Sequence, residues 1–221
     1  MDGLPTNESE IRSVLQSTAI EKIFVYPLGS SASNIGQVNL QFLKKMGIQN
    51  KTIITYCKIP EIAVKESLQN NEPNTVSFFW SCAVFHRENK LFFENPTCLP
   101  FFCEEHMFLD EMQLCIRPEL LNKYPKNIFL PTGWSIASHG APAPLVRSLP
   151  CKIVDAYSND DASKRCFNKE VELCITTESA RRMYGLTKVH SFGSPKMVFF
   201  AGITEHGAKT LSDVFQKIRA C

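Results

Sequence analysis

The stretch that decides the fold is residues 21–46, EKIFVYPLGSSASNIGQVNLQFLKKM. Its first part is an apolar, β-prone run, which predicts a strand that ends at a Gly-Ser turn. Beyond the turn, apolar residues recur at the spacing of one helical face: Ile35, Val38, Phe42, Leu43 and Met46. Gly47 is a typical stop signal for that helix. A strand that leads through a short turn into a helix is the repeating unit of α/β proteins.

The same alternation continues through the rest of the chain. Further strands are predicted at residues 51–57, 75–85, 91–95, 112–118, 127–133, 151–157, 171–176, 188–192 and 196–204. Helices are predicted at residues 11–20, 59–71, 143–149, 159–167, 176–186 and around 211–218. Because parallel strands need helical crossovers, the pattern predicts an α/β fold with a mostly parallel sheet. The Pro-rich stretch 95–102 is the expected crossing between two lobes.

Composition narrows the class of protein further. The 221 residues are 44% hydrophobic and 21% charged, which is ordinary for a globular domain and argues against disorder or a coiled coil. The net charge is only +2, so nucleic acid is not an expected partner. The polar N-terminus and the lack of a long apolar run predict a cytoplasmic chain that has no membrane contact.

Cysteine and histidine give no sign of a metal site. The nine cysteines include no C-x-x-C pair and mostly lie in apolar runs, where reduced thiols behave as small hydrophobes. The histidines outside the turns discussed next lack ligand spacing: His86, His106, His190 and His206. We therefore expect reduced cysteines and no metal.

Polar residues that could bind a ligand gather in strand-to-helix turns. Ser30, Ser31 and Ser33 precede the helix at 35–46, where free N–H groups and serine hydroxyls suit a carboxylate or phosphate. The simpler alternative is an N-cap formed by Ser33 or Asn34. A third possibility, a Walker phosphate loop, is excluded because no Gly-Lys-Ser/Thr follows.

Two later turns share this setting. In residues 132–140, Ser138 and His139 precede a predicted helix, and His139 suits a proton donor, a carboxylate partner or a structural residue. Residues 157–162 form the third turn, whose acidic pair also suits the first turn of a helix. Turns at the carboxyl ends of parallel strands meet in one crevice, so we expect a small anion to bind there. Arg117, which ends a predicted strand, is a natural carboxylate partner or else a surface residue.

These motifs together resemble the prephenate dehydratase family. That family has an L-G turn before a helix, an S-H turn, and a segment ending in Y-G-L near the end. Here these are Leu28-Gly29, Ser138-His139 and residues 180–186, ARRMYGL, in the same order. The resemblance implies a two-lobed fold of the periplasmic-binding-protein type with a ligand cleft between the lobes. The implied lobes are residues 20–100 plus 190–221 and residues 101–189, with residues 1–19 as an N-terminal helical extension.

Differences from the dehydratases imply a particular branch. The dehydratase Thr-Arg-Phe motif is replaced around residues 193–198, where Pro195 stands at the threonine position. The sequence is similar instead to non-aromatising prephenate decarboxylases of bacilysin and aeruginosin biosynthesis, which keep an Arg-Pro pair, here Arg117-Pro118. The resemblance implies a carboxy-lyase of antibiotic biosynthesis that converts prephenate to dihydro-4-hydroxyphenylpyruvate and CO2 without a cofactor.

The resemblance also implies roles for individual residues. The three serines of the first turn and Arg117 would anchor carboxylate, while Ser138 and His139 would contact the substrate, His139 as a possible proton donor. An apolar wall would come from Phe78, Phe79 and Trp80, and Pro195 cannot assist loss of the ring hydroxyl. The alternatives are an active prephenate dehydratase that forms phenylpyruvate, or a non-catalytic module that binds an organic anion. The apolar residues 91–102 suit either a homodimer contact or the core.

Overall fold

The computed structural model describes residues 3–31, 33–83, 88–124 and 133–220 and divides the chain into two compact units. The first unit is Met1–Met107 with Met197–Cys221, and the second is Phe108–Lys196. The chain leaves the first unit after residue 107 and returns to it at residue 197. Each unit contains its own five-stranded sheet. Helix α1 (Glu8–Gln16) contacts α2 and α7 and is therefore part of the first unit.

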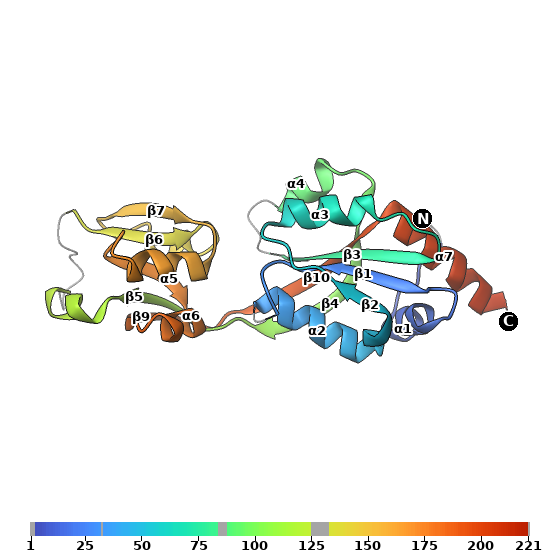
Figure 1. Cartoon of the computed structure of the whole chain (residues 1–221), viewed down its shortest axis with the longest axis horizontal. Coiled ribbons are helices and arrows are strands. Elements are labelled where there is room, and N and C mark those ends of the chain that lie inside the picture. Colours follow the sequence, from blue (N-terminus) through green and yellow to red (C-terminus); the bar gives the residue numbers. More distant parts are fainter. Residues whose placement is uncertain (1–2, 32, 84–87, 125–132, 221) are drawn as a thin grey trace. The chain divides into compact units, whose positions relative to one another are not determined.

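The first sheet has the strand order β2-β1-β3-β10-β4 (Figure 1). Its strands are β1 (Lys22–Tyr26), β2 (Thr52–Ile54), β3 (Thr75–Cys82), β4 (Cys98–Phe108) and β10 (Lys196–Thr204). Strand β1 pairs in parallel with β2 and β3, whereas β10 runs antiparallel to β3. The helices of this unit are α1, α2 (Asn34–Met46), α3 (Pro60–Gln69), α4 (Glu88–Phe93) and α7 (Glu205–Ala220), with a short 3-10 helix at Gln49–Lys51.

Helices cover both faces of this sheet, so β3 is buried along almost its whole length. On one face Trp80 meets Phe42 of α2 with ring centroids 5.3 Å apart, and on the other Phe79 packs near α3 and α4. Figure 1 shows α3 and α4 on one side of the sheet and α2 on the other. A strand that is covered on both sides reads as a continuous apolar run, as residues 75–85 do.

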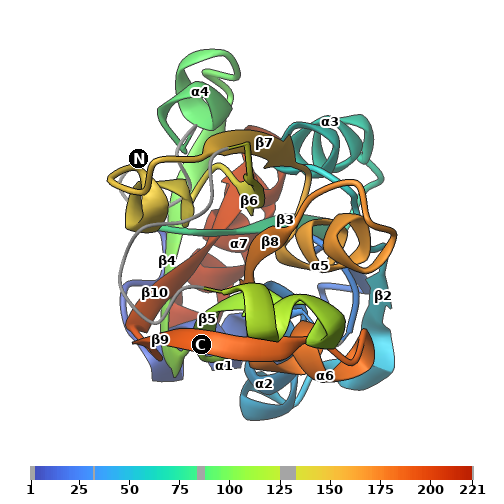
Figure 2. The same ribbon diagram turned by 90° about the vertical axis from the view of Figure 1, so that its left-hand side faces the viewer.

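The second sheet has the order β7-β6-β8-β5-β9. Its strands are β5 (Met112–Ile116), β6 (Ser135–His139), β7 (Lys152–Ala156), β8 (Leu173–Thr177) and β9 (Thr187–Gly193). The helices are α5 (Asn159–Phe167) and α6 (Glu178–Met183), with 3-10 helices at Pro118–Lys123 and Ala143–Val146. Figure 2 shows β5 and β9 side by side, in agreement with their antiparallel pairing.

The class of fold is confirmed, but each sheet is mixed and not mostly parallel. In the second sheet β6 pairs in parallel with β7 and β8, while β5 pairs antiparallel with β8 and β9. The antiparallel strands lie next to the places where the chain passes from one unit to the other. A sequence pattern that alternates strands and helices does not show these returning strands, because they follow directly on another strand.

Three local predictions need correction. Residues 91–93 were expected in a strand but belong to helix α4, where Leu91 is buried; a short apolar run suits either a buried strand or a buried helix. The Pro-rich stretch 95–102 is not the crossing, because most of it lies in β4, and an edge strand tolerates Pro100. Ser138 and His139 end strand β6 and do not lie in a turn. The strand predicted at 127–133 lies almost wholly outside the described residues.

Candidate functional site at the carboxyl edge of the second sheet

The parallel strands of the second sheet bring three chain segments to one edge. His139 ends β6, and its register partner Ala156 ends β7. Strand β8 runs parallel to β6 and ends at Thr177. Since β5 is antiparallel to β8 and Met112 is the partner of Thr177, the beginning of β5 lies at this edge as well. We refer to the residues at these strand ends as the carboxyl edge, which is where open α/β sheets bind ligands.

Two of the predicted site residues, Ser138 and His139, lie at this edge, with different exposure. Ser138 has no exposed surface, and its hydroxyl donates to the His139 carbonyl at 3.0 Å. His139 is half-buried at the end of the strand. Ser138 therefore supports the strand end, and His139 is the member of the pair that reaches solvent.

The turn from β7 into α5 is held by its own side chains. The Ser158 hydroxyl caps α5 by accepting from the Asp161 N–H at 3.0 Å, and the Asp161 carboxylate accepts from the Tyr157 N–H at 3.0 Å. Arg165 lies 3.1 Å from that carboxylate. The acidic residue thus has the role expected of it at a helix start, and it also fixes the backbone of Tyr157.

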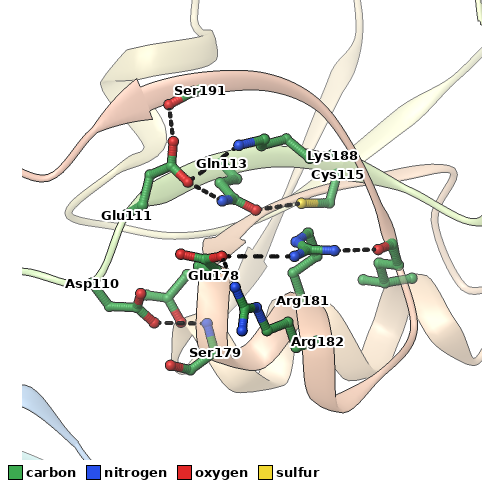
Figure 3. A network of polar contacts seen from close by, with 12 residues as sticks. Asp110, Glu111, Gln113, Cys115, Glu178, Ser179, Arg181, Arg182, Lys188 and Ser191 are labelled. Atoms are coloured by element: carbon green, nitrogen blue, oxygen red, sulfur yellow. Dashed lines mark hydrogen bonds and ion pairs between the residues drawn. The ribbon is translucent and has the colours of Figure 1, made fainter.

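The backbone N–H groups at the start of α6 already donate to acceptors of the chain itself. The Ser179 N–H donates to the Asp110 carboxylate at 2.8 Å, the Glu178 N–H donates to the Glu111 carbonyl at 2.9 Å, and Thr177 caps the Ala180 N–H at 3.4 Å. Figure 3 shows Asp110 and Ser179 facing each other. These N–H groups already have acceptors, so this end of α6 contributes structure and not anion binding.

Glu111 is the centre of a polar network beside α6 (Figure 3). Its carboxylate accepts hydrogen bonds from Ser191 and Gln113, and Lys188 lies 3.3 Å away. These donors, Ser191 foremost, lower the pKa of Glu111, so the side chain is ionised at neutral pH. The register of β5 and β9 shifts between Met112 and Gln113, which brings Ser191 opposite Gln113. Such bulges often adjoin functional sites.

Pro195 lies next to the same network. It follows β9, and its carbonyl accepts from the Leu109 N–H at 2.9 Å, immediately before Asp110 and Glu111. The residue is exposed and has no N–H to donate. The structure therefore brings Pro195 and His139 to one edge of one sheet, although β8 and β5 lie between their strands.

Arg117 lies at the opposite edge. It follows Ile116, whose register partner Leu173 begins β8, because β5 runs antiparallel to β8. The guanidinium is buried, and its Nη1 donates to the carbonyls of Cys166 and Val171 at 2.6 and 2.5 Å. Its Nε lies 3.2 Å from the Glu119 carboxylate. The expected role as a carboxylate anchor therefore gives way to a structural one: Arg117 holds the segment between α5 and β8.

In the first unit, the serine turn follows β1. Ser33 caps α2: its hydroxyl accepts from the Gly36 N–H at 3.1 Å and donates to the Leu28 carbonyl at 2.8 Å. A Cβ on Gly36 would lie 2.0 Å from the Ser30 carbonyl, so the turn can pack this closely only on glycine. The N-cap alternative therefore describes Ser33, while Ser30 and Ser31 are exposed beside the start of α2.

Phe78, Phe79 and Trp80 are core residues and not a ligand-facing wall. Each is at most 1% exposed. Phe78 stacks on Phe101 with centroids 5.5 Å apart, and Trp80 packs on α2 as described above. Because both faces of β3 are covered by helices, alternate side chains along it are buried in opposite halves of the same core.

Sequence reasoning did not single out Asp110, Glu111 or Ser191. Asp110 and Glu111 stand just before an apolar run, which is an ordinary place for surface carboxylates. Their role depends on the pairing of β5 with β8 and β9, which brings α6 and Ser191 to them. The sequence pattern places Tyr157 in a turn and gives it no further role. Among the described residues, no cluster of three or more His, Cys, Asp or Glu side chains could hold a metal ion.

Comparison with known proteins gives the fold and not a family. No family model matches the chain, and no curated protein sequence does. A VFT2 domain of BvgS from Bordetella pertussis is similar in structure, with a TM-score of 0.54, 14% identity, and coverage of 97% of this chain and 94% of that one. A putative methionine-binding lipoprotein from Bacillus subtilis gives a TM-score of 0.53, 10% identity, and coverage of 92% and 94%.

The chain therefore has the two-lobed α/β fold of periplasmic-binding-protein-like domains. None of the helices in the described part of the chain combines the length and the apolar character needed to cross a membrane.

Proposed function

We propose that the chain binds a small organic acid, and that the acid contacts the carboxyl edge of the second sheet. The observation that carries this proposal is the meeting of His139 and the β7–α5 turn at one edge. The fold supports it, since the similar structures include a putative methionine-binding lipoprotein. In the first unit, taken by itself, Ser30 and Ser31 are exposed beside the start of the 13-residue helix α2, where the helix dipole favours negative charge.

The carboxylates of the carboxyl edge do not oppose this proposal. Asp110, Glu111 and Asp161 each accept hydrogen bonds from groups of the chain, and Glu178 lies 2.5 Å from Arg182 and 3.9 Å from Arg181. Paired carboxylates exert a weaker repulsion on an incoming anion than free ones. The negative charge at the carboxyl edge is therefore largely compensated by donors of the chain itself.

A binding assay with one matched control tests this proposal. Prephenate, phenylpyruvate, pyruvate, arginine and methionine would be titrated by calorimetry into the full chain and into His139→Ala. His190→Ala is the control, because His190 lies on the edge strand β9 and packs on Phe192 at 4.8 Å. We expect at least one acid to bind and His139→Ala to bind it at least about tenfold more weakly, with His190→Ala unchanged. Equal affinity of the two variants, or no binding at all, would contradict the proposal.

We further propose, as a second candidate function, that the bound acid is prephenate and that the chain is a non-aromatising prephenate decarboxylase of antibiotic biosynthesis. The order of the L-G, S-H and Y-G-L motifs supports this candidate. So does the position of Pro195, at the edge that also contains His139 and without a hydrogen to donate. The similar structures do not address catalysis.

The proposed step needs no oxidant or cofactor. The bond between the ring carbon and its carboxylate breaks, CO2 leaves, and the electron pair enters the ring diene. One proton then adds to a ring carbon, for which His139 is the proposed donor, and the ring hydroxyl stays in place. A dehydratase would instead release the hydroxyl together with CO2 and form the aromatic ring.

Incubation with prephenate followed by mass and ultraviolet analysis separates the candidates. Dihydro-4-hydroxyphenylpyruvate is the expected product, and its formation should fall in His139→Ala and persist in His190→Ala. Phenylpyruvate would identify a dehydratase. If prephenate binds but its spectrum does not change, the binding function is supported and the enzymatic candidate is refuted.

A further inference from the structure

The loop between β7 and α5 presents an aromatic ring at the carboxyl edge. Tyr157 directly follows Ala156, the register partner of His139, and the residue is 84% exposed. Within the described part of the chain its ring has no aromatic neighbour and its hydroxyl has no hydrogen-bond partner. An aromatic side chain left in water forgoes the free energy of burying roughly 150–250 Å². At the carboxyl edge such a ring is available to pack against a ligand.

The backbone that carries this ring is fixed. The Tyr157 N–H is held by the Asp161 carboxylate at 3.0 Å, and the next residue, Ser158, caps α5. Arg165 in turn lies 3.1 Å from the same carboxylate, so the turn is tied to the second turn of the helix. The ring is therefore pre-organised for ligand binding, because its backbone is already fixed and little main-chain conformational entropy remains to be lost when a ligand binds.

We propose that Tyr157 is a ring-contacting residue of the ligand site, and that the ligand is a small acid with an unsaturated or aromatic ring. This inference rests on the proposed binding function of the carboxyl edge. It also replaces the wall expected from Phe78 and Trp80, which are buried in the first unit. The face of a tyrosine ring stacks on flat unsaturated groups, and its hydroxyl can bond to a polar substituent.

The same helix supplies a matched control. Phe167 ends α5, at the far end of the helix from Tyr157, and is 54% exposed. Unlike Tyr157, its ring packs on Tyr184 with centroids 5.9 Å apart. Truncation of Phe167 therefore removes an exposed aromatic ring from the same unit without touching the carboxyl edge.

The test compares acids with and without a ring. Prephenate and phenylpyruvate, which carry a ring and a pyruvyl group, and pyruvate, which lacks the ring, would be titrated into the full chain and into Tyr157→Ala, Tyr157→Phe and Phe167→Ala. Each variant is first shown to be folded by circular dichroism. We expect Tyr157→Ala to bind the ring acids about tenfold more weakly and pyruvate as before. Tyr157→Phe should keep most of the affinity, and Phe167→Ala all of it.

The outcomes distinguish this inference from the function on which it rests. If the full chain binds a ring acid and Tyr157→Ala binds it equally well, the role of Tyr157 is refuted and the binding function stands. The same holds if the full chain binds pyruvate but neither ring acid. If the chain binds none of these acids, both the binding function and the role of Tyr157 are refuted.

Discussion

Replacement of Arg117 by alanine tests whether this residue is structural. Arg117 is only 8% exposed, and its Nη1 donates to two backbone carbonyls, those of Cys166 and Val171. A hydrogen bond from a charged donor contributes about 1.5–3 kcal/mol net. The ion pair with Glu119 adds little, because the Glu119 side chain is 56% exposed. We therefore expect Arg117→Ala to destabilise the second unit by about 3–5 kcal/mol, which for a unit of this size lowers its melting temperature by more than about 10 °C.

The two tryptophans allow this loss to be measured in the right unit. Trp80 lies in the core of the first unit, and Trp134 packs against the core of the second. Urea unfolding followed by tryptophan fluorescence in a Trp80→Phe background reports on the second unit alone. Arg117→Lys is the control, since an ammonium keeps the charge and one donor group but loses the planar geometry, and an intermediate loss is expected.

The opposite pattern would refute the structural role. If Arg117→Ala unfolds at the same urea concentration as the parent but loses affinity for the acids that the parent binds, the guanidinium is a ligand group. The reasoning from strand direction, which places Arg117 at the edge away from His139, would then be wrong.

Three further predictions concern single buried or bonded groups. Asn39 is fully buried on α2, and neither of its amide atoms has a hydrogen-bond partner among the described residues. Asn39→Leu should therefore raise the free energy of unfolding of the first unit by about 1–3 kcal/mol, as measured by urea unfolding. A lower free energy of unfolding would contradict this prediction. The folded-state pKa of Glu111 is lowered, so its stabilising effect is present above its ordinary pKa near 4.5 and disappears as the pH falls through the lower folded value. Glu111→Gln should therefore destabilise the protein at pH 7 and do so progressively less as the pH is lowered below 4.5; a loss of stability that does not depend on pH would contradict this prediction. Burial raises the pKa of the Cys115 thiol to about 12, so mass spectrometry after iodoacetamide at pH 8 should find it unmodified in the native state and modified in urea.

Local patterns were sufficient to predict the class of fold and most of its elements. The run at 21–46 gave β1, its turn and α2 correctly because the apolar spacing, the Ser33 cap and Gly47 all agree. The apolar residues 75–82 were correctly assigned to a strand, since a strand covered on both faces is apolar throughout. Leu91 and its neighbours were assigned to the wrong type of element, because a short apolar run does not reveal its period.

What the sequence by itself determined is the set of local elements, because spacing, caps and turns act between residues near each other in the chain. Only the tertiary structure decided which end of a sheet each polar residue reaches. Arg117 and Asp110 are close in sequence yet lie at opposite ends of β5, and their edges follow from the antiparallel pairing of β5 with β8. That pairing joins residues some sixty positions apart through backbone hydrogen bonds, which leave almost no trace in local composition. For the same reason the sequence does not distinguish a ligand wall from core at Phe78 and Trp80, which are buried, and it does not show that Glu111 and Tyr157 lie at one edge of a sheet.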